Sequence, residues 1–245
     1  MEQWYEGAVY NRRFTFRYGD CDDKSRGSLF SVMKLLSEIA GEGYGGLGKE
    51  YAELWRTGQA FLLSRMSLRF HRTPVYTESV IASTWAREAR GPLFYRDFEI
   101  RSEEGAVLVS ASSAWLLVDI GSREILRPEA LTLPPKTESR VADCPESKKI
   151  RADKKLVPIG ERPVYHSDLD GNGHMNNAVY GRIATDFLPE IYREKALRDV
   201  FVDFHLETKL GQALEIYGGG VKNGYKLQGR IGDELHFGTE FIYED

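Results

Sequence analysis

The chain carries one short pattern twice, and this repeat limits the folds that are open to it. The pair Asp20 and Asp22 recurs 148 residues later as Asp168 and Asp170, each time in a polar, glycine-containing stretch. Apolar residues at three- and four-residue spacing follow each pair and predict an amphipathic helix. These helices are expected over residues 30–39 and about 177–188. A repeated turn and helix indicates two copies of one structural unit in a single chain.

Strand-like segments follow each predicted helix, with Gly, Pro or Asn between them. In the first half they cover residues 61–71, 78–86, 93–101 and 106–119. In the second half they cover residues 200–206, 213–222, 225–231 and 234–243. One further strand precedes each aspartate pair, at about 4–17 and 155–166. Each half is therefore predicted to be an α+β unit, in which an antiparallel sheet buries the apolar side of one long helix.

Residues 134–154 separate the two units. This stretch is charged, contains three prolines and has few apolar residues, which is typical of a linker. We therefore expect an N-terminal domain over residues 1–133, the linker over 134–154, and a C-terminal domain over 155–245. The glycine-rich stretch 41–59 has no counterpart in the second half, and either a mobile lid or a plain loop would account for it.

Composition excludes several classes of function. The 33 basic and 37 acidic residues give a net charge of −4, which does not favour nucleic-acid binding. No apolar run approaches the roughly 18 residues that span a bilayer, and the first residues lack a signal-peptide core, so a cytoplasmic protein without membrane insertion is expected. Cys21 and Cys144 are expected to be reduced and structural. The histidines lack zinc-ligand spacing, so neither a metal nor a cofactor is expected.

The second copy of the repeated turn holds the residues best suited to chemistry. Asp170, Asn172 and His174 lie within five residues, and glycines between them allow tight turns. An asparagine at the start of the following helix can cap it, and backbone N–H groups there favour developing negative charge. The residues expected to form this helix start and oxyanion site are Asn176, Asn177 and Ala178. A turn that combines a base, an acid and free amides suits the hydrolysis of an acyl group.

Two simpler interpretations compete with this one. The stretch that begins at Asp168 looks like the start of a calcium-binding loop, but such a loop needs Glu at its twelfth position, where this chain has Val179. An ordinary polar turn with a helix cap and no chemistry would use the same residue types.

The motifs resemble those of a known family. The second half contains Asp-Leu-Asp-x-Asn-x-His-x-Asn-Asn-x-x-Tyr over residues 168–180. The first half contains Leu-Leu-Ser-Arg-Met at 62–66, Arg-x-Pro-x-x-x-Glu-x-Val at 72–80, and Thr-Trp at 84–85. In this order, over nearly the whole chain, the motifs resemble the acyl-acyl-carrier-protein thioesterases and place the chain among bacterial relatives of the plant fatty acyl-ACP thioesterases. The resemblance implies a tandem, or double, hotdog fold and an acylated carrier protein as substrate.

The resemblance also implies which residues are catalytic. The family's catalytic Asp, Asn and His fall on Asp170, Asn172 and His174, and its catalytic Glu falls on Glu207. The surroundings of Glu207 depart from the family pattern at Phe204, where the family has Tyr, and at Gln212, where it has Asp. Plant members carry Cys at the position of Thr208. We therefore expect water activated by Glu207 or His174 rather than a thiolate, with no chemical role for Thr208.

The internal repeat supports a catalytic second half. Asn172 and His174 correspond to Lys24 and Arg26 at the offset of 148 residues. After the longer first-half loop the offset becomes 134 residues, and Glu207 then corresponds to Thr73. A purely structural turn has little reason to differ at all three positions. We expect the second hotdog to be catalytic and the first to shape the acyl pocket.

Two other functions remain open at this point. One is an acyl-CoA thioesterase, and the other is a non-hydrolytic acyl-binding or hydratase-type hotdog protein. The sequence leaves open the acyl chain length, the choice of carrier-protein or CoA thioester, and which of Glu207 and His174 is the base. It also leaves open the carrier-protein docking surface and the oligomeric state, including a homodimer.

Overall fold

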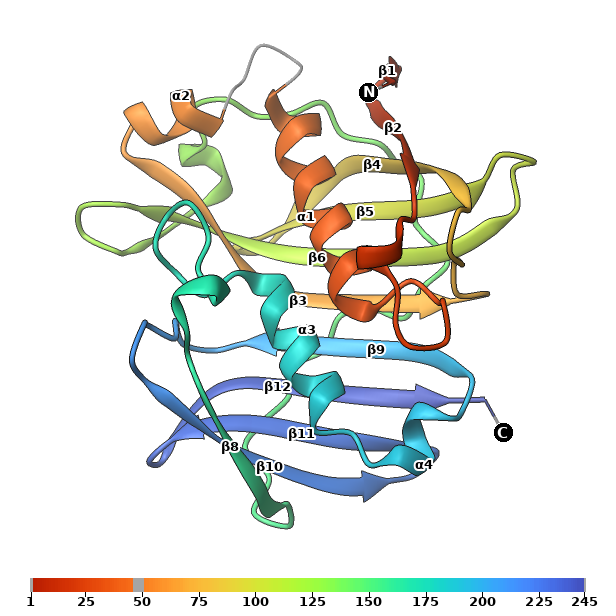
Figure 1. Cartoon of the computed structure of the whole chain (residues 1–245). Coiled ribbons are helices and arrows are strands. Elements are labelled where there is room, and N and C mark those ends of the chain that lie inside the picture. The colour runs from red at the N-terminus through yellow and green to blue at the C-terminus, as the bar shows by residue number, and fades with distance from the viewer. Residues whose placement is uncertain (1, 46–50, 245) are drawn as a thin grey trace.

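The computed structural model describes residues 2–45 and 51–244, and it joins both halves of the chain in one antiparallel sheet (Figure 1). The strand order is β1-β2-β4-β5-β6-β3-β9-β12-β11-β10-β8, and β7 pairs with β6. The strands are β1 (Gln3–Glu6), β2 (Val9–Thr15), β3 (Gln59–Phe70), β4 (Ser79–Arg90), β5 (Leu93–Ser102), β6 (Val107–Asp119), β7 (Ile125–Leu126), β8 (Val157–Pro163), β9 (Leu197–Phe204), β10 (Ala213–Val221), β11 (Gly224–Ile231) and β12 (Glu234–Tyr243).

Two long helices lie side by side on one face of this sheet, one from each half (Figure 1). The helices are α1 (Leu29–Gly45), α2 (Tyr51–Arg56), α3 (Asn177–Asp186) and α4 (Glu190–Arg193). The half-sheets meet where β3 pairs with β9, from Arg65 opposite Asp203 to Arg69 opposite Asp199. The predicted α+β double hotdog is therefore confirmed, and edge pairing of β3 with β9 makes its two sheets continuous.

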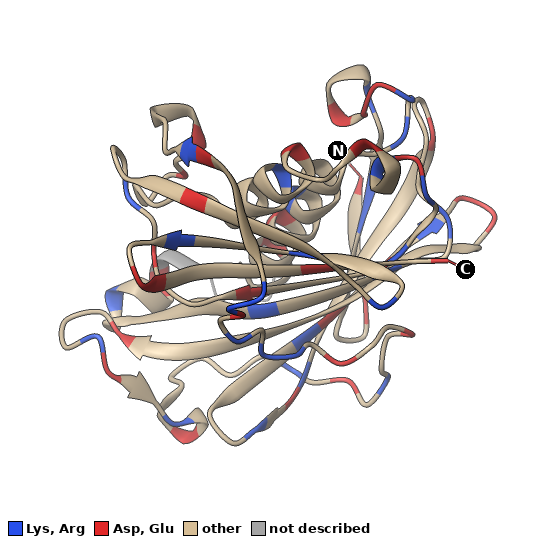
Figure 2. Ribbon diagram, turned by 90° about the horizontal axis from the view of Figure 1, so that it is seen from below, with Lys and Arg blue, Asp and Glu red and all other residues tan. Residues whose placement is uncertain are grey.

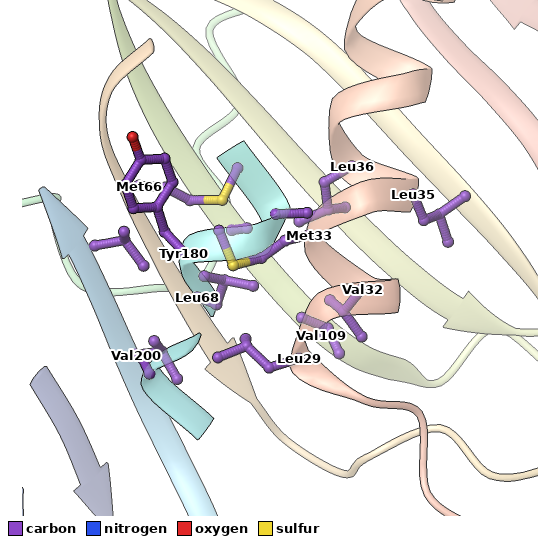
Figure 3. Packing of buried hydrophobic residues seen from close by; sticks show 14 of the residues in the cluster. Leu29, Val32, Met33, Leu35, Leu36, Met66, Leu68, Val109, Tyr180 and Val200 are labelled. Atoms are coloured by element: carbon purple, nitrogen blue, oxygen red, sulfur yellow. The ribbon is translucent and has the colours of Figure 1, made fainter. Parts of the chain in front are cut away.

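The spacing of apolar residues explains why the helices pack here. Apolar residues recur at three- and four-residue intervals along α1, at Val32, Leu36 and Ile39, and all three are fully buried. Ile183 of α3 is fully buried as well. Burial of each such side chain contributes roughly 1.5–3 kcal/mol. Figure 3 shows the α1 side chains meeting those of α3, β3 and β9 in one continuous core.

Gly181 of α3 faces α1. A Cβ at this position would lie 2.5 Å from the sulfur of Met33 on α1, so a larger residue here would force that side chain to shift. Under the offset of 148 residues Gly181 is the counterpart of Met33 itself, and the two halves thus fit a large residue against a small one.

The linker 134–154 crosses the opposite face of the sheet. Asp97 and Asp203 alternate with core residues along their strands and therefore point away from the helices. Asp97 accepts the Ala142 N–H at 2.9 Å, and Asp203 accepts the Ile150 N–H at 2.6 Å. Both linker residues are buried. The linker has no helix or strand, but its backbone is hydrogen-bonded to both half-sheets.

Two local predictions need correction. The strand expected over 4–17 is a hairpin of β1 and β2, because Gly7 turns the chain in the left-handed conformation, at φ 64°. The stretch 41–59 is largely helical, since α1 continues to Gly45 and α2 spans Tyr51–Arg56. Thr57 and Gly58 form a turn before β3, and residues 46–50 lie outside the described part of the chain.

Charged residues of both signs are distributed over loops, helices and strands (Figure 2). Within residues 2–45 and 51–244, no helix is long and apolar enough to cross a membrane.

Candidate active site

The turn before α3 is fastened to β8 by a buried carboxylate. Asp168, only 1% exposed, accepts two N–H groups of Arg162, at 2.7 and 2.8 Å, and the backbone N–H of Tyr165 at 2.8 Å. Burial alone would raise the pKa of Asp168, but the hydrogen bonds from Arg162 and Tyr165 hold that pKa below its usual value. The carboxylate is therefore ionised at neutral pH. Its ion pair with Arg162 attaches the turn firmly to β8.

Asp170 organises the turn through its backbone. Its Oδ1 accepts the backbone N–H of Asn172 at 2.8 Å and that of His174 at 3.3 Å. Gly173 lies between them at φ 77°, a left-handed conformation that glycine adopts without strain. Asp170 thus determines where the side chains of Asn172 and His174 begin, although it makes no hydrogen bond to either side chain.

The start of α3 resolves which asparagine is the cap. Asn176 accepts the N–H of Ala178 at 2.9 Å through its side chain, and its own N–H donates to the carbonyl of Asp168 at 2.9 Å. Of the three amides expected to serve an oxyanion, those of Asn176 and Ala178 are therefore engaged. Within the described residues the N–H of Asn177 has no hydrogen-bond acceptor, so it remains available at the helix N-terminus.

Two candidate residues that are far apart in sequence meet beside this helix start. The Nε2 atom of His174 lies 3.9 Å from Oε2 of Glu207, which follows β9. Both side chains are accessible, at 44% and 35% exposure. This distance exceeds hydrogen-bond length, so the two side chains are not hydrogen-bonded to each other. Asn172 is exposed on the same turn. The structure therefore brings Glu207 to the turn that carries Asp170, Asn172 and His174.

The first half contributes a residue that the sequence analysis missed. Arg123, in the turn between β6 and β7, places Nη1 4.0 Å from the same Oε2 of Glu207. Nothing in the sequence near Arg123 distinguishes it, because its closeness to Glu207 depends on how the halves pack. The site thus lies at the border between the halves.

Comparison with models of protein families decides the assignment. The acyl-ACP thioesterase N-terminal domain matches residues 7–130, and the acyl-ACP thioesterase C-terminal domain matches residues 153–239. The chain belongs to the acyl-ACP thioesterase family. This thioesterase is therefore a hydrolase of acyl-ACP thioesters. A search of curated protein sequences finds no significant match.

Solved structures show the same fold over nearly the whole chain. An acyl-ACP thioesterase from Bacteroides thetaiotaomicron matches with a TM-score of 0.89 at 20% identity, covering 97% of this chain and 98% of its own. A protein described as an oleoyl thioesterase from Lactobacillus plantarum matches with a TM-score of 0.80 at 21% identity, covering 97% of both chains. A 12:0-ACP thioesterase from Umbellularia californica matches with a TM-score of 0.84 at 16% identity, covering 98% and 99%.

The first-half turn of this thioesterase repeats the geometry of the second without its chemical groups. Asp22 Oδ1 accepts the backbone N–H of Lys24 and of Arg26, each at 2.9 Å, as Asp170 does in the second half. Arg26 is ion-paired with Asp22 at 2.7 Å, and Lys24 is ion-paired with Glu194. These residues line a cavity of about 840 Å³ at the other end of the helix pair. Ion pairs thus stand where the second half has candidate acid–base groups.

Neither cysteine lies at the candidate active site. Cys21 belongs to the first-half turn and Cys144 to the linker. Burial raises the pKa of Cys144 to about 12 and also raises that of Cys21, so both thiols stay protonated at neutral pH. Among residues 2–45 and 51–244, no cluster of three or more His, Cys, Asp or Glu side chains could hold a metal ion.

Proposed function

We propose that this thioesterase releases fatty acid from acyl-ACP with Asp170, Asn172, His174 and Glu207 as its catalytic set. The observation that supports this assignment is the 3.9 Å approach of His174 and Glu207 beside the start of α3. An imidazole and a carboxylate, both accessible, meet at a helix N-terminus that retains a free amide. These are the groups that hydrolysis of an acyl group requires.

Water is the nucleophile in this proposal. Glu207 or His174 takes a proton from water while the water oxygen attacks the thioester carbonyl carbon. The resulting oxyanion accepts hydrogen bonds from the backbone N–H of Asn177 and the side-chain amide of Asn172. The intermediate then collapses and expels the carrier-protein thiolate, which receives the proton. The other product is the free fatty acid. Asp170 fixes the backbone of the turn that holds Asn172 and His174.

The surroundings of Glu207 support water over a thiol. The residue after Glu207 is Thr208, and both cysteines lie elsewhere with raised pKa values. Carboxylate and imidazole chemistry therefore needs no group that is absent from the site. The same arguments assign catalysis to the second half and leave the first half to contribute the acyl pocket.

Steady-state hydrolysis of acyl-ACP and acyl-CoA over a series of chain lengths tests the proposal. His174→Ala and Glu207→Gln should each lower kcat by about 10² or more, the scale for losing a general acid–base group. The double variant should lose little more than the worse single variant, because both groups serve one step. Acyl-CoA should be the poorer substrate.

The counterpart positions in the first half provide matched controls. Arg26→Ala and Thr73→Ala change the residues that correspond to His174 and Glu207, and both should keep a kcat near that of the wild type. A silent Glu207→Gln variant, or equal losses in the two halves, would contradict the assignment.

A further inference from the structure

Three buried side chains form a hydrogen-bonded chain directly behind the candidate site. The Tyr180 hydroxyl donates to Thr208 Oγ1 at 3.0 Å, and Thr208 Oγ1 lies 2.9 Å from His236 Nδ1. None of the three residues is more than 4% exposed. They come from α3, from the segment after β9, and from β12. These hydrogen bonds therefore connect three elements that are distant in sequence.

The hydrogen-bonded chain of Tyr180, Thr208 and His236 holds the segment that carries Glu207. The carbonyl of His236 accepts the backbone N–H of His205 at 2.9 Å and that of Leu206 at 3.2 Å. Residues 205 and 206 are thus bound to β12 through the backbone, and Thr208 is bound through its side chain. Glu207 lies between these two attachments. Burial raises the pKa of Tyr180 against its hydrogen bonding with Thr208, and the charge of Glu207 adds a smaller increase.

A neutral His236 allows a continuous donor–acceptor order along these hydrogen bonds. Burial lowers the pKa of His236, so its ring is neutral at neutral pH. A neutral ring can accept at Nδ1 if its proton is on Nε2, and the Thr208 hydroxyl can then donate to it while accepting from Tyr180. Each hydroxyl group donates once in this arrangement. Protonation of His236 would make Nδ1 a donor, and Thr208 Oγ1 would then accept from both His236 and Tyr180.

The first half shows what the same scaffold looks like without this network. Its turn and helix correspond to those of the second half at an offset of 148 residues, which pairs Tyr180 with Val32. The offset of 134 residues pairs Thr208 with Pro74. Leu108 corresponds to His236, because its carbonyl accepts the N–H groups of residues 71 and 72 as His236 accepts those of 205 and 206. The three counterparts are Val, Pro and Leu, whose side chains cannot form hydrogen bonds.

The hotdog scaffold therefore does not need these polar groups in order to fold. A hydrogen-bonded chain occurs in the half that contains Glu207, and apolar packing takes its place in the other. Burying three polar side chains is unfavourable unless they pair with one another, so their presence behind Glu207 calls for a local reason.

We propose that Tyr180, Thr208 and His236 are positioning residues that hold Glu207 at its working distance from His174. They touch no substrate and act through the segment 205–208. The inference rests on the proposed catalytic role of Glu207. Thr208 keeps no chemical role, as expected from sequence, but it gains a positioning role: in place of the cysteine of the plant relatives, its hydroxyl is the central member of the hydrogen-bonded chain.

Variants that remove one hydroxyl without changing shape test this proposal. Thr208→Val and Tyr180→Phe should each lower kcat for acyl-ACP by roughly 10- to 100-fold and leave KM nearly unchanged, as expected when a catalytic group is displaced. Tyr180→Phe keeps the ring contacts with Phe204 and Phe237, at 5.4 and 5.1 Å. Thr208→Ser retains the hydroxyl and should recover most of the activity.

Thr239→Val is the matched control. Thr239 is fully buried on β12 like His236, but within the described residues its hydroxyl has no hydrogen-bond partner. This variant should keep the wild-type kcat. The Tyr180→Phe and Thr208→Val double variant should be no slower than the slower single variant, because both break one chain. Circular dichroism and the melting midpoint should confirm that each variant is folded.

The outcomes distinguish the two proposals. If the wild type fails to hydrolyse acyl-ACP, or if Glu207→Gln is fully active, the proposed function itself is wrong. If Glu207→Gln is impaired while folded Tyr180→Phe and Thr208→Val keep the wild-type kcat, only the positioning role is wrong. Should Thr208→Val fail to fold, Tyr180→Phe and Thr208→Ser still decide: a fully active Tyr180→Phe, or a Thr208→Ser as slow as Glu207→Gln, overturns it.

Discussion

The salt bridge between Arg162 and Asp168 allows a quantitative test of how the turn before α3 is held. Asp168→Asn keeps the size of the side chain but removes its charge, and it leaves the Arg162 guanidinium without its carboxylate. Removing one partner of a buried ion pair costs about 3–5 kcal/mol. We take the lower end, about 3 kcal/mol, because Arg162 keeps 17% exposure and water can solvate it partly.

The expected change in melting midpoint follows from the size of the protein. For a domain of this length, 1 kcal/mol corresponds to about 2–4 °C, so Asp168→Asn should melt about 6–12 °C below the wild type. The first-half counterpart supplies the control. Asp20 accepts the backbone N–H of Arg17 at 2.8 Å, but Phe14 stands where the second half has Arg162. Asp20→Asn should therefore shift the midpoint by about 3 °C or less.

The dependence on pH tests the electrostatic part of the argument. The folded-state pKa of Asp168 is lowered, so the ionised carboxylate stabilises the protein above its unfolded pKa, about 3.9, and this contribution disappears as the pH falls through the folded-state value. The stability difference between wild type and Asp168→Asn should persist from about pH 5 to about pH 8 and narrow below about pH 4. Urea denaturation followed by circular dichroism measures it. Equal losses of stability in Asp168→Asn and Asp20→Asn, or a stability difference that does not change with pH, would show that the buried ion pair does not hold the turn.

Two further results are expected. A Cβ at Gly224 would collide with the carbonyl oxygen of Phe241 in the paired strand, so Gly224→Ala should cost about 2 kcal/mol or more, whereas Gly19→Ala, with open space around it, should stay within about 0.5 kcal/mol in the same melting assay. Iodoacetamide at about pH 7.5 should leave kcat unchanged, because burial raises the pKa of both Cys21 and Cys144; stoichiometric inactivation would restore a thiol mechanism.

The local pattern of the chain was a good guide to its elements. The helix expected over about 177–188 spans Asn177–Asp186, and the last strand has the predicted bounds, Glu234–Tyr243. Period-3.6 and period-2 patterns report which side chains face the core, and these helices and strands each bury one face. The errors at Gly7 and in residues 41–59 arise where glycines allow both turns and continued structure, a choice made by the contacts around them.

The candidate site likewise contains residues whose closeness could be predicted from the sequence and residues whose closeness depends on tertiary packing. Asp170, Asn172 and His174 lie on one turn, so their closeness could be predicted from spacing. Glu207 was assigned through a family resemblance, and its 3.9 Å distance to His174 depends on how β9 packs beside α3. Arg123 carried no local signal, because it comes from the other half of the chain.

Two similar units in succession, with polar residues suited to acyl hydrolysis in the second, could be recognised from the residues alone. Both conclusions rest on the order of residues along a short stretch. The tertiary structure alone decided that β3 and β9 join the two sheets and that Thr208 belongs to a buried chain with Tyr180 and His236. The physical reason is that these contacts are non-local. Their partners lie 28 or more residues apart, and no periodic pattern in a single segment records which distant side chains will share a buried space.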